Sequence, residues 1–172
     1  MSAFSISATG LTWLSDPVND PLDHCLHGHA IARVGERTVA YDCTVSATAL
    51  YLLKTLTEDH VPGQQIQLLP CCGFFLIADV DLQNVTIIGC DNGEDWSVIH
   101  EGNDVTLILS DGYSVTLPLE EYRQTVCHFA DTIEAYYNAC PPRAELTDEF
   151  DRNGYTAFWN EWHRRRGPKQ EE

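Results

Sequence analysis

The chain has 172 residues and a formal net charge of −16, since 26 aspartates and glutamates stand against 10 lysines and arginines. Its length fits a single domain spanning residues 1–172, and its hydrophobic content of 44% excludes a disordered acidic tail. Such a charge disfavours direct binding to nucleic acid or to an anionic membrane. No segment reaches the roughly 20 apolar residues that a membrane-spanning helix needs.

Short strands are predicted for the first 43 residues. Residues 4–6 and 11–14 are candidates for a first strand, ahead of a turn-rich stretch at 16–21. Residues 28–35 and 38–43 then read as two strands joined at Gly35. The start of the chain has neither the basic region nor the apolar run of a secretory signal, so we expect a cytoplasmic location.

A helix is predicted for residues 45–59, where the hydrophobic period changes. Apolar residues at helical spacing would form one buried face: Val45, Ala49, Leu52, Leu53 and Leu56. Thr44 or Ser46 can cap its start, and Pro62-Gly63 would end it.

Strands dominate the prediction from Gln65 to Leu117. The candidates are 66–69, 74–78, 85–88, 96–100, 105–109 and 113–117. Asp111-Gly112 between the last two predicts a type I′ hairpin, in which both central residues have positive φ. The short connections favour an antiparallel meander.

Two further helices are predicted at 118–139 and 154–166. Pro118 suits a helix start, and Tyr155, Phe158 and Trp162 repeat at helical spacing in the second helix. The arginines at 164–166 are interpreted as a helix end rather than as a nucleic-acid patch. The predicted fold class is α+β: an antiparallel sheet meander with about three helices packed on it.

The charge is unevenly distributed along the sequence. No lysine or arginine occurs between Lys54 and Arg123, and that window of 68 residues holds twelve carboxylates. This pattern predicts a solvated acidic face without internal salt bridges, suited either to solubility or to binding a basic protein partner. The predicted partner-binding residues lie in its turns: Asp91, Glu94, Asp95, Trp96, Glu101, Asp104 and Asp111. Trp96 is expected to be partly exposed as an apolar anchor, with the alternative that a tryptophan on a strand is more often in the core.

A second cluster lies at residues 23–29. His27 and His29 at i, i+2 on a strand would face the same side, with His24 or Cys25 as a possible third zinc ligand. No paired motif elsewhere completes such a site, so no metal and no cofactor is predicted. Likewise, no phosphate loop, dinucleotide fingerprint, serine-hydrolase elbow or metalloprotease motif is present.

The seven cysteines are expected to be free thiols, mostly buried, as in a reducing compartment. Cys71-Cys72 is interpreted as a bend with one thiol buried. A catalytic thiol needs an electropositive setting that lowers its pKa. The acidic window around this pair argues against that role.

Several strings together resemble a group of small acidic bacterial cytosolic proteins: DPLDHCLHG, TVSATALYLLKTL, LPCCGF, GCDNGEDW, YRQTVCHFADTIEAYY and GYTAFWNEW. In size and charge the chain also resembles the immunity proteins of polymorphic and contact-dependent growth inhibition toxins. The resemblance implies an inhibitor that neutralises a basic toxin domain, such as a nuclease. The alternatives are a nucleic-acid mimic, a regulatory interaction module, and a zinc or cysteine enzyme built around 24–29.

Overall fold

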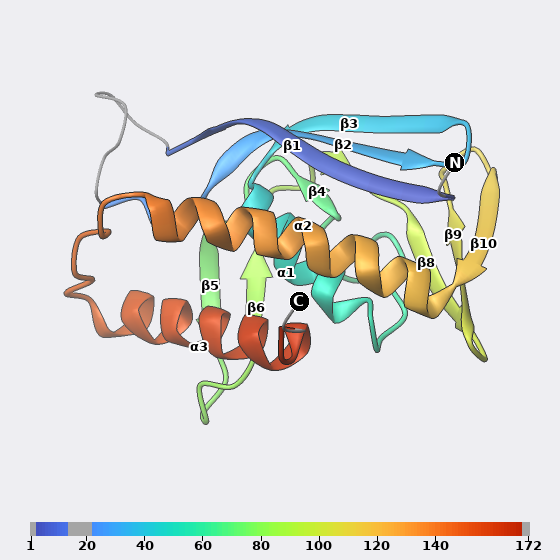
Figure 1. The fold of residues 1–172 in the computed structure, drawn as a ribbon. Coiled ribbons are helices and arrows are strands. Elements are labelled where there is room, and N and C mark those ends of the chain that lie inside the picture. The colour runs from blue at the N-terminus through green and yellow to red at the C-terminus, as the bar shows by residue number, and fades with distance from the viewer. Residues whose placement is uncertain (1–2, 14–21, 170–172) are drawn as a thin grey trace.

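Residues 3–13 and 22–169 are described by the computed structural model, and they begin with a three-stranded antiparallel sheet (Figure 1). The sheet consists of β1 (Phe4–Thr12), β2 (His27–Val34) and β3 (Arg37–Cys43), in that order. β1 is longer than predicted, with an irregular register between Thr9 and Thr12. Leu14 and the predicted turn at 16–21 lie outside the described residues.

The helix α1 (Val45–Lys54) forms the centre of the molecule, between α2 and α3 (Figure 1). Every residue from Val45 to Leu53 is buried. The spacing of its leucines predicted burial of one face alone, whereas the helix is buried on all sides. Its buried polar groups are paired: Ser46 Oγ accepts from Leu26 N–H at 3.1 Å, and Thr48 Oγ1 lies 3.6 Å from Cys43 Sγ.

The hairpin β5 (Phe75–Ala78) and β6 (Val85–Ile88) packs against α3 (Glu149–Arg166). The approach is close because Gly154 faces Leu76: a Cβ at this position would lie 2.4 Å from the Leu76 carbonyl oxygen. The helix starts five residues earlier than predicted. Asp148 caps it by accepting hydrogen bonds from the Phe150 and Asp151 N–H groups at 2.9 and 3.2 Å.

The remaining strands form a small ladder and a second three-stranded sheet. β4 (Leu69–Pro70) pairs with β7 (Gly93–Glu94), and β9 (Asp104–Ile108) lies between β8 (Ser97–Glu101) and β10 (Ser114–Pro118). The predicted strand at 66–69 is mostly loop, although Ile66 and Leu68 are buried.

The predicted hairpin at 105–117 is present, but its turn is not type I′. The ladder stops at the Ile108–Ser114 pair, and Gly112 N–H donates to the Leu109 carbonyl at 2.9 Å. Gly112 has φ 83, whereas Asp111 does not have a positive φ. A type I′ turn requires positive φ at both central residues, so this prediction was wrong.

The helix α2 (Leu119–Ala139) lies across the front of the molecule, next to β1 and α1 (Figure 1). Its buried face contains the predicted residues Tyr122, Val126, Phe129, Ala130 and Ile133. With three helices and antiparallel pairing in every sheet of the described chain, the α+β class is confirmed. The strands are divided among four sheets rather than joined in one meander. No helix of the described chain is long and apolar enough to cross a membrane.

Candidate functional site

The predicted acidic residues lie at two ends of the β8–β10 sheet. Glu101 and Asp104 pair across the tight turn between β8 and β9. Asp111 lies in the turn that joins β9 to β10, at the other end of strands about 16 Å long. Asp95 precedes β8 and is therefore also at the Asp111 end. The structure thus does not bring the predicted residues together on one face.

Asp95 and Trp96 point into the structure. Trp96 is fully buried and packs near Phe4, with ring centroids 6.3 Å apart. Asp95 Oδ1 accepts from the Leu68 N–H at 3.0 Å and lies 2.8 Å from Nε2 of the buried His60. The prediction that Trp96 is a partly exposed anchor was wrong. The acidic residues before it suggested an exposed turn, but its neighbours in the core come from distant segments.

The window has no lysine or arginine of its own to form internal salt bridges, but not all of its carboxylates are left to solvent. Arginines from outside the window reach into it: Arg37 Nη2 lies 3.7 Å from Asp111 Oδ2, and Arg165 binds Glu58. His100 Nδ1 lies 2.8 Å from Asp59 Oδ1. Hydrogen bonds from the His100 backbone N–H and ring lower the pKa of Asp59.

These contacts occupy most of the chain's cations. Seven of the ten lysines and arginines, all within the described residues, lie within 4.0 Å of a carboxylate: Arg37, Lys54, Arg123, Arg164, Arg165, Arg166 and Lys169. The arginines at 164–166 end α3 as predicted, and each contacts a carboxylate of the chain. The negative excess therefore remains on carboxylates without a cationic partner.

Two such carboxylates, Glu101 and Asp104, are exposed and face each other in register. Within the described residues, neither has a lysine, arginine or histidine within 4.0 Å. Like charges directly opposite each other on antiparallel strands destabilise the pair. The turn between them is tight, with Gly102 at φ 67, which keeps the two side chains near each other.

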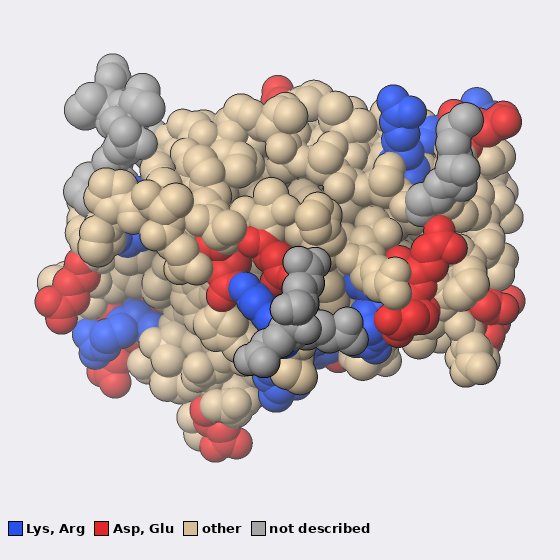
Figure 2. Space-filling view, viewed as in Figure 1, with Lys and Arg blue, Asp and Glu red and all other residues tan. Residues whose placement is uncertain are grey.

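The start of α2 brings two more carboxylates near this pair, because Leu119 N–H donates to the Asn103 carbonyl at 2.8 Å; one of them, Glu120, lies 3.9 Å from Arg123. Glu120 and Glu121 follow in its first turn, where the helix dipole favours carboxylates. We call Glu101, Asp104, Glu120 and Glu121 the acidic end. Figure 2 shows acidic side chains gathered where α2 begins, with basic side chains next to them. The two glutamates were missed because no sequence pattern links position 103 to position 119.

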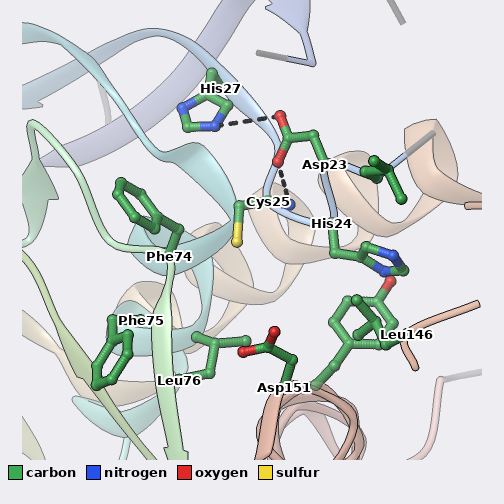
Figure 3. Close-up of a pocket in the computed structure, with 11 residues that line it drawn as sticks. Asp23, His24, Cys25, His27, Phe74, Phe75, Leu76, Leu146 and Asp151 are labelled. Atoms are coloured by element: carbon green, nitrogen blue, oxygen red, sulfur yellow. Dashed lines mark hydrogen bonds and ion pairs between the residues drawn. The ribbon is translucent and has the colours of Figure 1, made fainter. Parts of the chain in front are cut away.

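The second candidate is a pocket of about 340 Å³ between the segment 22–27, β5 and α3 (Figure 3). The residues that line it are mainly apolar. Two of them, Phe74 and Phe75, are unusually exposed for phenylalanine, with 58% and 48% of their surface accessible to solvent. Asp23, Cys25 and His27 line the other side. His27 Nε2 lies 3.6 Å from Asp23 Oδ2, and the same carboxylate accepts from the Cys25 N–H at 3.0 Å. Volume and lining are those of a small-ligand pocket.

The chemistry of this pocket does not favour a thiol nucleophile. Burial raises the pKa of the Cys25 thiol to about 12, so the thiolate is scarce at neutral pH. Burial also lowers the pKa of His27, which removes a cation that could stabilise a thiolate. Cys25 is thus a protonated side chain beside a neutral imidazole.

The three histidines of the segment contact different partners. His24 packs edge-on against Tyr155 with centroids 4.6 Å apart, His27 contacts Asp23, and His29 Nδ1 lies 2.7 Å from Asp42 Oδ1. His27 and His29 do border one shared depression beside β3. However, no group of three histidine, cysteine or acidic side chains in the described chain is arranged to hold a metal ion.

Neither a protein family, nor a curated protein, nor a solved structure was found to match this chain. The functional argument therefore depends on the geometry and charge of the sites themselves.

Proposed function

We propose that this protein is an immunity-type inhibitor, which binds and neutralises a basic toxin domain, such as a nuclease, through the acidic end. The observation that carries the proposal is the pairing of Glu101 with Asp104 across a tight turn, with no cation beside them in the described chain. The pair costs stability in the free protein. A lysine or arginine of a partner would remove this repulsion, so part of the binding energy comes from its relief.

The physical match is to an enzyme that binds phosphates. A nuclease presents a positively charged groove to the nucleic-acid backbone, and a fixed cluster of carboxylates competes for that groove. Long-range attraction between opposite charges also speeds association, which an inhibitor of a lethal enzyme needs. Most of the chain's own cations are engaged away from the acidic end, and Arg123 is the exception among the ion pairs of the described chain, at 3.9 Å from Glu120.

The proposed binding site differs from the one expected from the sequence. It retains Glu101 and Asp104, adds Glu120 and Glu121, and omits the buried Trp96. Asp91 and Glu94 are accessible and have no cationic partner in the described chain, so they add to long-range steering. Asp111 is already paired with Arg37.

The test uses the product of the gene adjacent to the one that encodes this chain. Co-expression should rescue growth if that product is a toxin, and the purified pair should associate more slowly as salt is added. Glu101→Gln with Asp104→Asn should slow association about tenfold or more at low salt and flatten its salt dependence. A harmless neighbour that does not bind, or association kinetics that the double variant leaves unchanged, would refute the proposal.

A matched control removes the same charge elsewhere. Asp81→Asn with Glu36→Gln also deletes two exposed carboxylates, from turns that are separate from the acidic end. If binding depends on the acidic end, this control should change the association rate much less than the test variant. Equal effects of both variants would indicate that only net charge matters, which contradicts a defined site.

A further inference from the structure

Three cysteines meet where β4 pairs with β7. Cys71 and Cys72 follow β4, and Cys90 precedes β7. Cys71 N–H donates to the Asn92 carbonyl at 3.1 Å, and Cys90 N–H donates to Cys72 Sγ at 3.0 Å. The sulfur of Cys72 therefore lies against the backbone of Cys90, although 17 residues separate them in the chain.

Two glycines hold these segments together. A Cβ at Gly89 would lie within 1.9 Å of the Cys72 carbonyl oxygen, and a Cβ at Gly93 within 2.5 Å of the Leu69 carbonyl oxygen. Only glycine permits such backbone contact. The backbones of the two segments are therefore in direct contact, and the 3.0 Å between Cys90 N and Cys72 Sγ brings the two cysteines together.

The three thiols differ in protonation. Hydrogen bonds from the Cys72 thiol and from the backbone at Asn92 lower the pKa of Cys90. Hydrogen bonding to Cys90 raises the pKa of Cys72 and that of Cys71. Cys90 is thus the preferred thiolate, and its neighbours keep their protons. The acidic window led us to expect no activated thiol here, but local hydrogen bonds act more strongly on Cys90 than distant carboxylates.

Access to solvent completes the arrangement. Cys71 is exposed, and Cys72 and Cys90 are partly exposed. In contrast, Cys25 and Cys43 are buried, and burial raises their pKa to about 12 and about 11. An accessible thiolate beside a second thiol is the usual arrangement of redox-sensing cysteines. All seven cysteines are free, but only two are buried, fewer than expected.

We propose that Cys90 and Cys72 are a redox-active pair that hydrogen peroxide oxidises to a disulfide. The Cys90 thiolate attacks one peroxide oxygen, the O–O bond breaks, and Cys90 becomes a sulfenic acid while the leaving hydroxide takes a proton to become water. The sulfur of Cys72 then attacks the Cys90 sulfur. The S–O bond breaks, the Cys72 proton leaves with that oxygen as a second water, and a disulfide remains. Two thiols lose two electrons, and one peroxide gains them.

The experiment treats the full chain with hydrogen peroxide, blocks the remaining thiols with iodoacetamide, and maps the products by mass spectrometry. Trypsin cannot separate the three cysteines, because no lysine or arginine lies between Lys54 and Arg123. Cleavage before aspartate, at Asp79 and Asp81, separates Cys90 from Cys71 and Cys72, which stay together on one peptide. The peptides with Cys72 and Cys90 should then stay joined until a reductant is added, while Cys25 and Cys43 remain unoxidised.

Three single variants identify the pair, with thermal melts confirming that each one folds. Cys71→Ser should form the joined peptide at the wild-type rate, and Cys90→Ser should not form it. Cys72→Ser should form it about tenfold more slowly, because Cys71 is less favourably placed to attack. Equal rates in Cys72→Ser and wild type would overturn the assignment to Cys72. Failure of the wild-type protein to form the joined peptide, or faster oxidation of Cys25, would overturn the redox pair.

Discussion

Glu161 and Lys54 form a buried ion pair between α3 and α1, with Nζ 3.4 Å from Oε2. Glu161 is completely buried, and its carboxylate also accepts from the Val85 N–H at 2.8 Å and from Arg165 Nε at 2.7 Å. Lys54 in turn donates to the Val85 carbonyl at 2.7 Å. One carboxylate thus connects two helices with the β6 strand, and burial lowers the pKa of the lysine it faces.

Glu161→Gln should therefore destabilise the protein strongly. The change leaves Lys54 as a buried cation without its counter-ion, which typically costs about 3–5 kcal/mol. The free energy of unfolding in urea measures the loss. Glu145→Gln, at an exposed position in the loop before α3, should change that free energy by less than about 0.5 kcal/mol. Similar effects for the two variants would contradict the assigned role of Glu161.

Gly154→Ala tests the close packing of α3 on β5. Alanine favours the helix by about 1 kcal/mol over glycine. However, its methyl group would lie 2.4 Å from the Leu76 carbonyl oxygen, which is backbone and cannot rotate away. Overpacking costs about 1–3 kcal/mol, so we expect a net destabilisation of up to about 2 kcal/mol in urea unfolding. Thr156→Ala, on the exposed face of the same helix, should be near neutral. A stabilised Gly154→Ala protein would disprove the close contact.

Acid should weaken the junction between α2 and α3. Burial alone would raise the pKa of Asp131 and that of Glu134, but contacts with cationic side chains outweigh it. Arg166 and Lys169 lower the pKa of Asp131, and Lys169 and His163 lower the pKa of Glu134. Carboxyls with a lowered folded-state pKa stabilise the protein above their ordinary values of 3.8 and 4.5, and this contribution is lost as pH falls through the folded-state values. Unfolding free energy should therefore fall below about pH 4.

Asp131→Asn isolates the first of these groups. Asp131 binds Arg166 through both carboxylate oxygens at 2.8 Å. The variant should therefore lose about 1 kcal/mol of unfolding free energy at neutral pH, and its unfolding free energy should depend less on pH in acid. The control Asp81→Asn removes an exposed carboxylate without a cationic partner in the described chain. If Asp131→Asn keeps the full pH dependence of the wild type, the α2–α3 ion pairs do not govern it.

Local patterns predicted most of the elements because they depend on neighbours in the sequence. The buried face of α2 follows from the spacing of Tyr122, Val126 and Phe129, and the end of α3 from arginines followed by Gly167. The start of α3 was missed although its signal was present. Asp148 is a strong cap, but Gly154 weakens the helical propensity of the turns behind it.

The candidate sites depend on contacts between distant segments, which local patterns do not encode. Trp96 follows a run of acidic residues and was expected near the surface, yet it packs near Phe4 of β1. The pairing of Glu101 with Asp104 is local and could have been predicted from the Gly102-Asn103 turn. The approach of Cys90 to Cys72 depends on the β4–β7 ladder, which has only two residue pairs and leaves no periodic signal.

Asp104→Lys should stabilise the free protein while weakening the proposed binding. It replaces a carboxylate–carboxylate pair with an opposite-charge pair at the same cross-strand position, a change worth about 0.5 kcal/mol. Thermal melts should show the gain in stability at low ionic strength. Salt at about 1 M should remove most of this gain, because charges are then screened within about 3 Å. Asp81→Lys makes the same charge change at a turn position that has no partner in the strand ladder, so it separates cross-strand pairing from net charge. If Asp104→Lys gains no more stability than Asp81→Lys, then Glu101 and Asp104 do not repel each other. Relief of their repulsion could then not contribute to the proposed binding.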